Sequence, residues 1–182
     1  MEIIKTPIKD LVVIKPRVFA DTRGFFFETY NEERYREAGI TPQFVQDNMS
    51  KSSYGVVRGL HFQRPPYSQA KLVQVIEGAV LDVAVDLRSD SETYGQWYAV
   101  ELTAENHLQF LIPRGFAHGF AVLSETAIFS YKCDNFYHPE ADGGVMYNDP
   151  TFNIDWRIPA DKIVLSEKDK KHPLFKDLEK IF

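Results

Sequence analysis

Apolar and polar residues alternate in short runs along most of the chain, and this period of two predicts β-strands. Turns rich in Gly, Pro, Asn and Asp separate the runs. The predicted strands after residue 44 are Val56–Gln63, Lys71–Ile76, Ala79–Leu87, Tyr98–Leu102, Leu108–Ile112, His118–Leu123 and Ala127–Cys133. Many short strands with few helices indicate an all-β sandwich or barrel.

The pattern around Glu77-Gly78 leads to two more specific predictions. The strands Lys71–Ile76 and Ala79–Leu87 flank this turn signal, which predicts a hairpin. Within 81–87, leucines and valines occupy alternate positions and Asp82 and Asp86 lie between them. Because successive side chains of a strand point to opposite faces, we expect one dry face and one polar face.

The chain ends have a different pattern. Residues 1–20 alternate loosely and are predicted as edge strands, and Phe25–Tyr30 is a predicted strand because aromatic residues favour β-structure. Asn31 is a candidate N-cap for a helix over 31–38, and Gly39 a candidate stop. The charged C-terminus is predicted to be partly helical, over Glu167–Lys171 and Lys176–Ile181.

Composition narrows the class of protein. The 182 residues are enough for one domain with a sizeable core, which we place at 1–182. A formal net charge of −5 argues against a nucleic-acid or membrane-surface binder, since both need a basic surface. Cys133 is the single cysteine, so neither an intrachain disulfide nor a cysteine zinc site is expected. Without a signal-like or membrane-spanning apolar run, the expected location is cytoplasmic.

The segment 56–63 carries the densest candidate chemistry. His61 is a candidate general base, because an imidazole with a pKa near 6.5 suits proton abstraction at neutral pH. Arg58 adds positive charge and Gln63 an orienting amide. On a regular strand Arg58 and His61 point to opposite faces, whereas a bulge at Gly59 would bring them together. The sequence leaves this open, and a purely structural histidine remains the alternative.

Four further residues are candidates if the chain folds them towards His61. The Lys71 ammonium would stabilise an oxyanion, although lysines are usually just solvated. His118, among aromatic residues and glycines, fits the wall of a pocket or a purely structural role. Tyr131 shares an apolar face with its strand neighbours, as a core tyrosine also would. Asp169 lies in a charge run that is typical of a solvated helix.

A metal site is not expected. Small β-barrels that hold metals use two closely spaced histidines, a carboxylate and a later histidine. His61 is followed by Phe62-Gln63 with no second histidine nearby, and His107, His138 and His172 are scattered. Phosphate-binding loops are not expected either, because Asp142-Gly143-Gly144 has neither the P-loop lysine nor a Rossmann context.

Six stretches together carry a resemblance that none carries alone. They are Asp21–Glu28, Gln46–Ser50, Gly55–Gln63, Lys71–Val75, Ile112–Phe120 and Tyr131–Tyr137. With these stretches the chain resembles the dTDP-4-dehydrorhamnose 3,5-epimerase family over essentially its whole length. The resemblance implies a cupin-type jelly roll that works as a homodimer, without metal or organic cofactor.

The resemblance also implies roles for individual residues. His61 would be the base, oriented by Asp169; Tyr131 would be the acid on the other face of the sugar; and Lys71 would stabilise the enolate. The residues that would bind substrate are Arg58 and His118 in the pocket, Arg23, Glu28, Gln46 and Asn48 on the nucleotide, Tyr137 on the thymine, and Asp142 and Lys168 more weakly. Asp142 stands where the family has a glutamate, which leaves its role open.

The implied reaction is chemically consistent with these residue types. C3 and C5 of a 4-keto sugar are both adjacent to the carbonyl, so their protons become removable when the enolate is stabilised. Inversion needs a base and an acid on opposite faces of the ring. Three alternatives stay open: an epimerase acting at C3 or C5 alone, a metal-dependent cupin oxygenase, and a non-catalytic sugar-binding module. Whether Arg23 and Glu28 reach a partner's site is also open.

Overall fold

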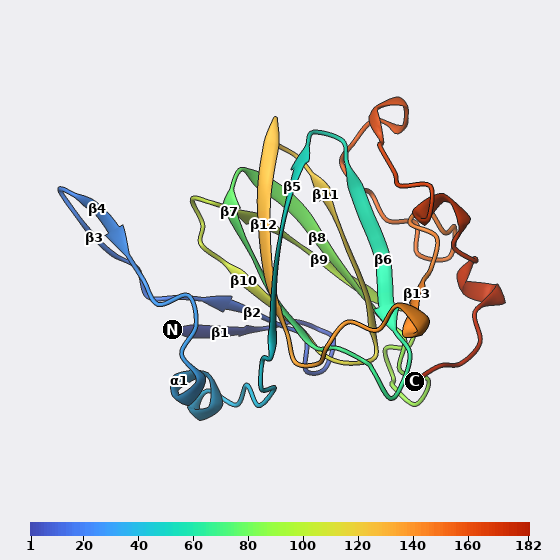
Figure 1. The fold of residues 1–182 in the computed structure, drawn as a ribbon, viewed down its shortest axis with the longest axis horizontal. Coiled ribbons are helices and arrows are strands. Elements are labelled where there is room, and N and C mark those ends of the chain that lie inside the picture. Colours follow the sequence, from blue (N-terminus) through green and yellow to red (C-terminus); the bar gives the residue numbers. More distant parts are fainter.

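Two large antiparallel sheets face each other in the computed structural model, which describes residues 1–182, and a small hairpin projects at one end (Figure 1). The first sheet has the order β1 (Glu2–Lys5), β2 (Val12–Lys15), β10 (Gln109–Ile112), β7 (Lys71–Glu77), β12 (Thr126–Cys133), β5 (Gln46–Ser53). The second has the order β13 (Asp142–Gly144), β6 (Val57–Gln63), β11 (Phe116–Val122), β8 (Ala79–Asp86), β9 (Trp97–Thr103). The projecting hairpin pairs β3 (Phe19–Asp21) with β4 (Gly24–Phe26). No strand is shared between the sheets, so the all-β fold is an open jelly-roll sandwich rather than a closed barrel.

The main core lies between the two sheets. Phe110 and Phe129 from the first sheet pack with Phe116 and Phe120 from the second. Phe110 and Phe129 are at most 1% exposed, and burying each side chain stabilises the fold by ~2 kcal/mol. The outer face of the second sheet is covered by the C-terminal segment, through side chains such as Trp156. Both walls of the space between the sheets are therefore fixed by packing.

Short helices lie at the periphery. The helix α1 (Glu32–Glu37) begins at the predicted N-cap, where the Asn31 side chain accepts a hydrogen bond from the Arg34 N–H. It covers the outer face of the first sheet through the buried Tyr35. The predicted C-terminal helices are only single 3₁₀ turns, among four in the chain: η1 (Pro139–Ala141), η2 (Ala160–Lys162), η3 (Asp169–Lys171) and η4 (Phe175–Asp177). None of the helices has the length and apolar character that crossing a membrane requires.

The predicted hairpin at Glu77-Gly78 is wrong. β7 pairs with β10 and β12, while β8 pairs with β11 and β9, so the turn carries the chain from one sheet to the other. Gly78 has a φ of +79°, and a Cβ there would lie 2.1 Å from the Thr126 carbonyl oxygen. The glycine therefore allows a corner between sheets rather than a turn within one.

The predicted polar face of β8 is also wrong. Asp82 and Asp86 are both fully buried, as are the apolar residues beside them. The Asp86 carboxylate accepts hydrogen bonds from Arg88, Ser91 and Thr93. The fold tolerates these buried carboxylates because each has a hydrogen-bonding partner: His118 for Asp82 and Arg88 for Asp86. The alternation of apolar and acidic residues does not reveal such partners, so it suggested a solvent-facing polar side.

The strand predicted at Phe25–Tyr30 is only partly formed. β4 ends at Phe26, and the chain then leaves the hairpin towards α1. The Thr29 carbonyl oxygen accepts hydrogen bonds from the side chains of Gln109 and Tyr35, so its partners are side chains and not a neighbouring strand. Tertiary contacts override the β-propensity of the aromatic run here.

The corner at Gly78 gives a test of the fold. Gly78→Ala is expected to lower the free energy of unfolding by roughly 2–4 kcal/mol, because the new methyl would collide with the backbone of Thr126 and Ala127. Gly39→Ala is the matched control: Gly39 has a φ of +87° with no atom near its Cβ position, so we expect about 1 kcal/mol. Urea unfolding measures both variants. Equal losses would show that the crowding at Gly78 is not what constrains the corner.

Candidate active site

A cavity of about 380 Å³ opens between the two sheets. Its walls come from strands of both: His61 and Gln63 belong to β6, whereas Lys71 belongs to β7 and Tyr131 to β12. The other lining residues are Gln46, Asn48, Phe62, Gln69, Tyr137, Asp142 and Lys168. Most of the residues selected from the sequence therefore line one space.

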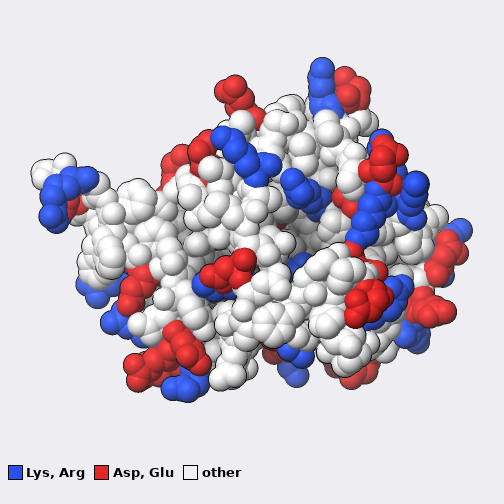
Figure 2. Space-filling model, in the orientation of Figure 1, with Lys and Arg blue, Asp and Glu red and all other residues white.

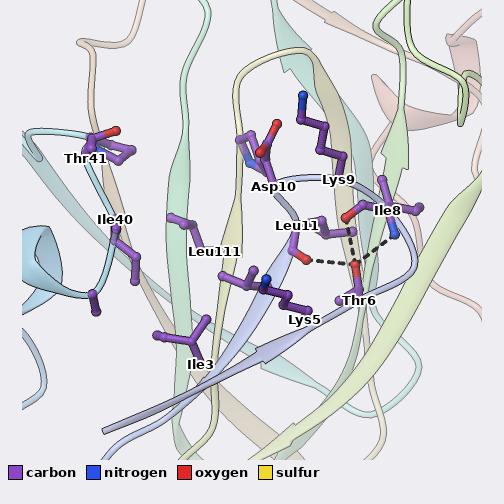
Figure 3. A pocket seen from close by; sticks show the side chains of 15 residues that line it. Ile3, Lys5, Thr6, Ile8, Lys9, Asp10, Leu11, Ile40, Thr41 and Leu111 are labelled. Carbon is purple, nitrogen blue, oxygen red and sulfur yellow. Dashed lines mark hydrogen bonds between the residues drawn. The ribbon is translucent and has the colours of Figure 1, made fainter.

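A larger depression, of about 550 Å³, lies beside β1, β2 and the segment after α1 (Figure 3). Its side chains include Ile3, Ile8, Leu11 and Ile40, and the Thr6 hydroxyl is occupied by hydrogen bonds to the backbone of the same segment. Its ionisable side chains, Lys5, Lys9 and Asp10, are all exposed to solvent. The smaller cavity is therefore the candidate active site.

A bulge in β6 settles the orientation of Arg58 and His61. In β11, His118 pairs with His61 and Phe120 pairs with Arg58, so two residues of β6 stand opposite the single Gly119. The bulged Gly59 has a φ of +118°. Arg58 Nε donates to Ser52 Oγ of β5 at 3.1 Å, across to the other sheet. Both side chains are thus directed towards the first sheet, as the bulge interpretation requires, but only His61 lines the cavity, and Arg58 lies outside its lining.

His61 is held by Asp169, which arrives from η3. The distance from His61 Nε2 to Asp169 Oδ1 is 2.6 Å. Burial raises the pKa of Asp169, but the nearby His172 and His61 side chains and the Gly59 N–H outweigh it and keep this pKa well below its usual range, so the group is a carboxylate that only accepts. Nε2 therefore carries the proton, and the lone pair left for proton abstraction is on Nδ1.

Burial lowers the pKa of His61, and Asp169 partly opposes that shift. Lys71 and His172 add to it because they repel a second positive charge. The net direction favours the neutral imidazole at neutral pH. A neutral imidazole is the form that can accept a proton from a substrate.

Lys71 and Tyr131 lie next to each other on the first sheet, with the lysine Nζ 5.8 Å from the tyrosine ring centroid. Burial lowers the pKa of Lys71, while the nearby Cys133 and Asp82 favour its charged form. Burial raises the pKa of Tyr131, and the Arg58 charge offsets part of that rise. Tyr131 is thus a protonated phenol at neutral pH, on the wall that faces His61.

His118 lies behind the cavity rather than in it. Its Nε2 contacts both oxygens of Asp82, at 2.9 and 3.0 Å. Burial lowers the pKa of His118 and raises that of Asp82. The link between this pair and the cavity is electrostatic: the charge of Lys71, which lines the cavity, lowers the pKa of both His118 and Asp82.

Five predicted binding residues form a hydrogen-bonded row along the cavity. Gln46 accepts from the Tyr137 backbone N–H at 2.9 Å and donates to Asn48 Oδ1 at 3.1 Å. The Tyr137 hydroxyl donates to Asp142 Oδ2 at 3.3 Å, and Lys168 Nζ pairs with the same oxygen. Asp142 therefore holds both Tyr137 and Lys168 in place.

Arg23 and Glu28 lie outside the cavity. Arg23 sits on the projecting β3–β4 hairpin (Figure 1), where its side chain is 88% exposed and pairs with Asp21. Basic side chains are visible at the tip of this projection in Figure 2, away from the body of the chain. Glu28 pairs with Arg34 of α1. Within one chain the structure does not bring these two residues to the other candidates.

Two residues differ from the sequence-based interpretation. Gln63 does not orient His61: its amide bonds the backbone of Tyr67, Phe136 and His138 and so anchors loops. His172 is not scattered, because its Nε2 lies 3.4 Å from Asp169 Oδ1.

A ligand atom from each of His61, Asp169 and His172 lies within 4.8 Å of the others, the one metal-like cluster in the structure. The 2.6 Å contact between His61 and Asp169 is a hydrogen bond, however. An ion bound by both at about 2.0–2.2 Å would hold the two atoms farther apart. The spacing from His61 to His172 hides this cluster in the sequence.

Comparison with known proteins places the chain in a family. A family model described as dTDP-4-dehydrorhamnose 3,5-epimerase matches residues 5–177. The curated enzyme of that name from Methanothermobacter thermautotrophicus is 51% identical over 92% of this chain and 90% of its own. The crystal structure of the Elizabethkingia anophelis enzyme is 60% identical, with a TM-score of 0.93 and 97% of both chains covered.

A Legionella pneumophila 3,5-epimerase, solved in complex with dTDP-4-keto-L-rhamnose, is 49% identical with a TM-score of 0.94, covering 98% of this chain and 94% of that one. The similarity thus extends over nearly the whole length of each protein, in sequence and in fold. The chain belongs to the dTDP-4-dehydrorhamnose 3,5-epimerase family.

Proposed function

We propose that this protein inverts C3 and C5 of dTDP-4-dehydro-6-deoxy-D-glucose to give dTDP-4-dehydro-L-rhamnose. The observation that carries the proposal is the placement of His61 and Tyr131 on opposite sheets, facing one cavity. Inversion requires removing a proton from one face of the sugar and returning one to the other. A histidine and a tyrosine on separate walls supply that arrangement, and the family membership supports it.

The first step is proton abstraction by His61 Nδ1 from a carbon next to the C4 ketone. The electron pair of the broken C–H bond moves to the C4 oxygen and forms an enolate. The Lys71 ammonium stabilises that oxygen as its charge develops. Asp169 stabilises the imidazolium that forms, because its carboxylate already accepts the Nε2 proton at 2.6 Å.

The second step is reprotonation by Tyr131 from the opposite face. Its raised pKa keeps the phenol protonated in the free enzyme, so a proton is available. When Tyr131 gives up its proton, the positive charge of the Arg58 guanidinium stabilises the phenolate that forms. Solvent then removes the proton from His61 and restores that on Tyr131, and repetition at the second carbon completes the double inversion.

The row along the cavity supplies the nucleotide site. We assign the thymine face to Tyr137, which is 53% exposed, so its ring can stack on a base. Gln46 and Asn48 present amides for the nucleoside, and Lys168 and Arg58 supply positive charge for the pyrophosphate. Asp142 holds Tyr137 and Lys168 in place and is not itself assigned to the nucleotide.

We also propose a homodimer in which each hairpin reaches the other protomer's site. Arg23 and Glu28 lie outside their own cavity, and the hairpin leaves Phe25 and Phe26 more than 60% exposed. On the first sheet Met49 is 68% exposed and Ile76 48%. A second copy of the chain would bury these apolar side chains. Residues 1–182 as one domain and a cytoplasmic location stay predictions.

Proton exchange tests the two-wall mechanism. Incubation with dTDP-4-dehydro-6-deoxyglucose in D₂O, with chelator present, is expected to place deuterium at both C3 and C5, measured by mass spectrometry and proton NMR. His61→Asn should lower exchange by at least ~100-fold, the scale of a lost general base. Tyr131→Phe should retain exchange while inversion falls, because abstraction survives without the acid.

The outcomes separate the alternatives. Deuterium at one carbon would identify a C3-only or C5-only epimerase. Activity lost to the chelator would indicate a metal-dependent reaction. Wild-type epimerisation by Tyr131→Phe would contradict the assignment of the acid. If the wild type binds the dTDP-sugar but exchanges none of its protons, the protein is a non-catalytic sugar-binding module.

Mixing two inactive proteins tests the shared site. Arg23→Ala and His61→Asn are each expected to be weakly active alone. After mixing and subunit exchange, one site of each mixed dimer has an intact His61 and the partner subunit's Arg23, so activity should return. No recovery would place Arg23 in its own chain's site, and a fully active Arg23→Ala would remove it from the site altogether. Light scattering on the same samples checks the dimer.

A further inference from the structure

His172 follows η3 and lies outside the substrate cavity, against the carboxylate that holds His61. Its Nε2 is 3.4 Å from Asp169 Oδ1, the same oxygen that His61 Nε2 contacts at 2.6 Å. The two imidazole rings meet edge to face, with centroids 5.5 Å apart and an interplanar angle of 67°. One carboxylate oxygen thus faces two histidines, only one of which the mechanism uses.

The His172 Nε2 is the one buried side-chain polar atom of the chain that makes no hydrogen bond. The side chain is 8% exposed, so water does not replace the missing partner freely. Leaving such a group unpaired costs about 1–3 kcal/mol. Contacts of 3.4 Å are common in unliganded active sites and shorten when substrate binds. Asp169 Oδ1 is the acceptor that this nitrogen faces.

Packing fixes the ring from the other side. Gly144 of β13 pairs in register with His61 of β6. A Cβ at Gly144 would lie 2.4 Å from His172 Cε1, so the imidazole occupies the space that a side chain would fill. The ring is therefore wedged between the strand next to His61 and the Asp169 carboxylate.

We propose that His172 is a positioning residue for the epimerisation, which holds the Asp169 carboxylate in the orientation that serves His61. The inference rests on the proposed function, because the orientation of His61 matters only if it abstracts a proton. A donor on Oδ1 from the second side limits rotation of the carboxylate. It also shares the carboxylate's charge, so that His61 is stabilised less strongly as an imidazolium than it would be by Asp169 alone.

The charges around His61 set the sign of the expected shift. Asp169 favours its protonation, while Lys71 of β7 and His172 oppose it. His118 of β11 also faces His61 across the strand pair. Removing His172 removes both a repulsion and a competitor for Oδ1. The pKa of His61 should therefore rise, and the acid limb of the kcat/KM profile should move to higher pH.

Two substitutions at His172 distinguish the role of its N–H donor from the role of its ring as a space-filling group. His172→Phe keeps an aromatic ring in the wedge but has no donor. His172→Gln places an amide N–H near the position of Nε2. Lys171→Gln is the charge control, since Lys171 is an exposed neighbour on η3 whose side chain forms no hydrogen bond or ion pair with Asp169. Thermal unfolding confirms that each variant is folded.

Steady-state kinetics and NMR titration of the His61 ring in the free protein give the result. His172→Phe is expected to lower kcat about 10-fold with KM unchanged, and to raise the pKa of His61. His172→Gln should recover most of kcat, and Lys171→Gln should behave as wild type. Wild-type kcat and titration in His172→Phe, a change in KM alone, or no recovery in His172→Gln would each overturn the proposal.

The two readouts keep this proposal distinct from the proposed function. If the wild type neither exchanges protons nor epimerises, the proposed function fails. The NMR titration still shows whether His172 acts on His61 through Asp169, because it needs no substrate. An active wild type with a His61 titration that is indifferent to His172→Phe would defeat the positioning role alone.

Discussion

The close approach of β6 and β11 is the constraint on which the site depends. Opposite Gly119, β6 carries an extra residue, and a Cβ on Gly59 would lie 2.6 Å from the Gly119 Cα. Only backbone fits between the strands at this point. The bulge that results turns Arg58 and His61 to the same side and leaves the Gly59 N–H directed towards Asp169, at 3.5 Å from Oδ2. One local irregularity thus positions the base and its orienting carboxylate together.

Burial then sets the charge state of each group. Asp82, His118 and Asp169 are buried and Lys71 is half-buried, and each lies near a group of opposite charge or a hydrogen-bond partner. Such pairing is what makes buried ionisable groups tolerable. The same arrangement leaves His61 neutral and Tyr131 protonated, the forms that a base and an acid need before substrate arrives. Stability and chemistry here use the same contacts.

Local pattern predicted much of this fold and less of the site. Most strands after residue 44 and the helix capped by Asn31 follow from alternation and capping, because those signals are local, whereas β5 and β13 are not among the predicted strands. The Gly78 corner was mistaken for a hairpin, since a tight glycine turn looks the same within one sheet or between two. The buried Asp82 and Asp86 were mistaken for a polar face because their partners are distant or lie in the following loop.

Long-range pairs explain the remaining misses. Asp169 resembles a residue of a solvated charge run until the chain folds it against His61, and the same fold hides His172 beside it. The bulge at Gly59 was an open possibility because sequence shows a glycine but not the strand opposite. The roles themselves came from the resemblance and not from spacing. The structure shows in addition that His61 and Tyr131 lie on opposite walls of the cavity, and that Arg23 and Glu28 lie outside the cavity of their own chain.

In the proposed mechanism, base and acid act from opposite faces of one sugar ring. The most direct measurement is a crystal structure of the His61→Asn variant with dTDP-4-dehydro-6-deoxyglucose bound. The sugar ring is expected between the side chain at position 61 and the Tyr131 hydroxyl, one on each face, with Lys71 Nζ in hydrogen-bond contact with the C4 oxygen. A ring with both side chains on the same face, or with Tyr131 out of reach of C3 and C5, would contradict it.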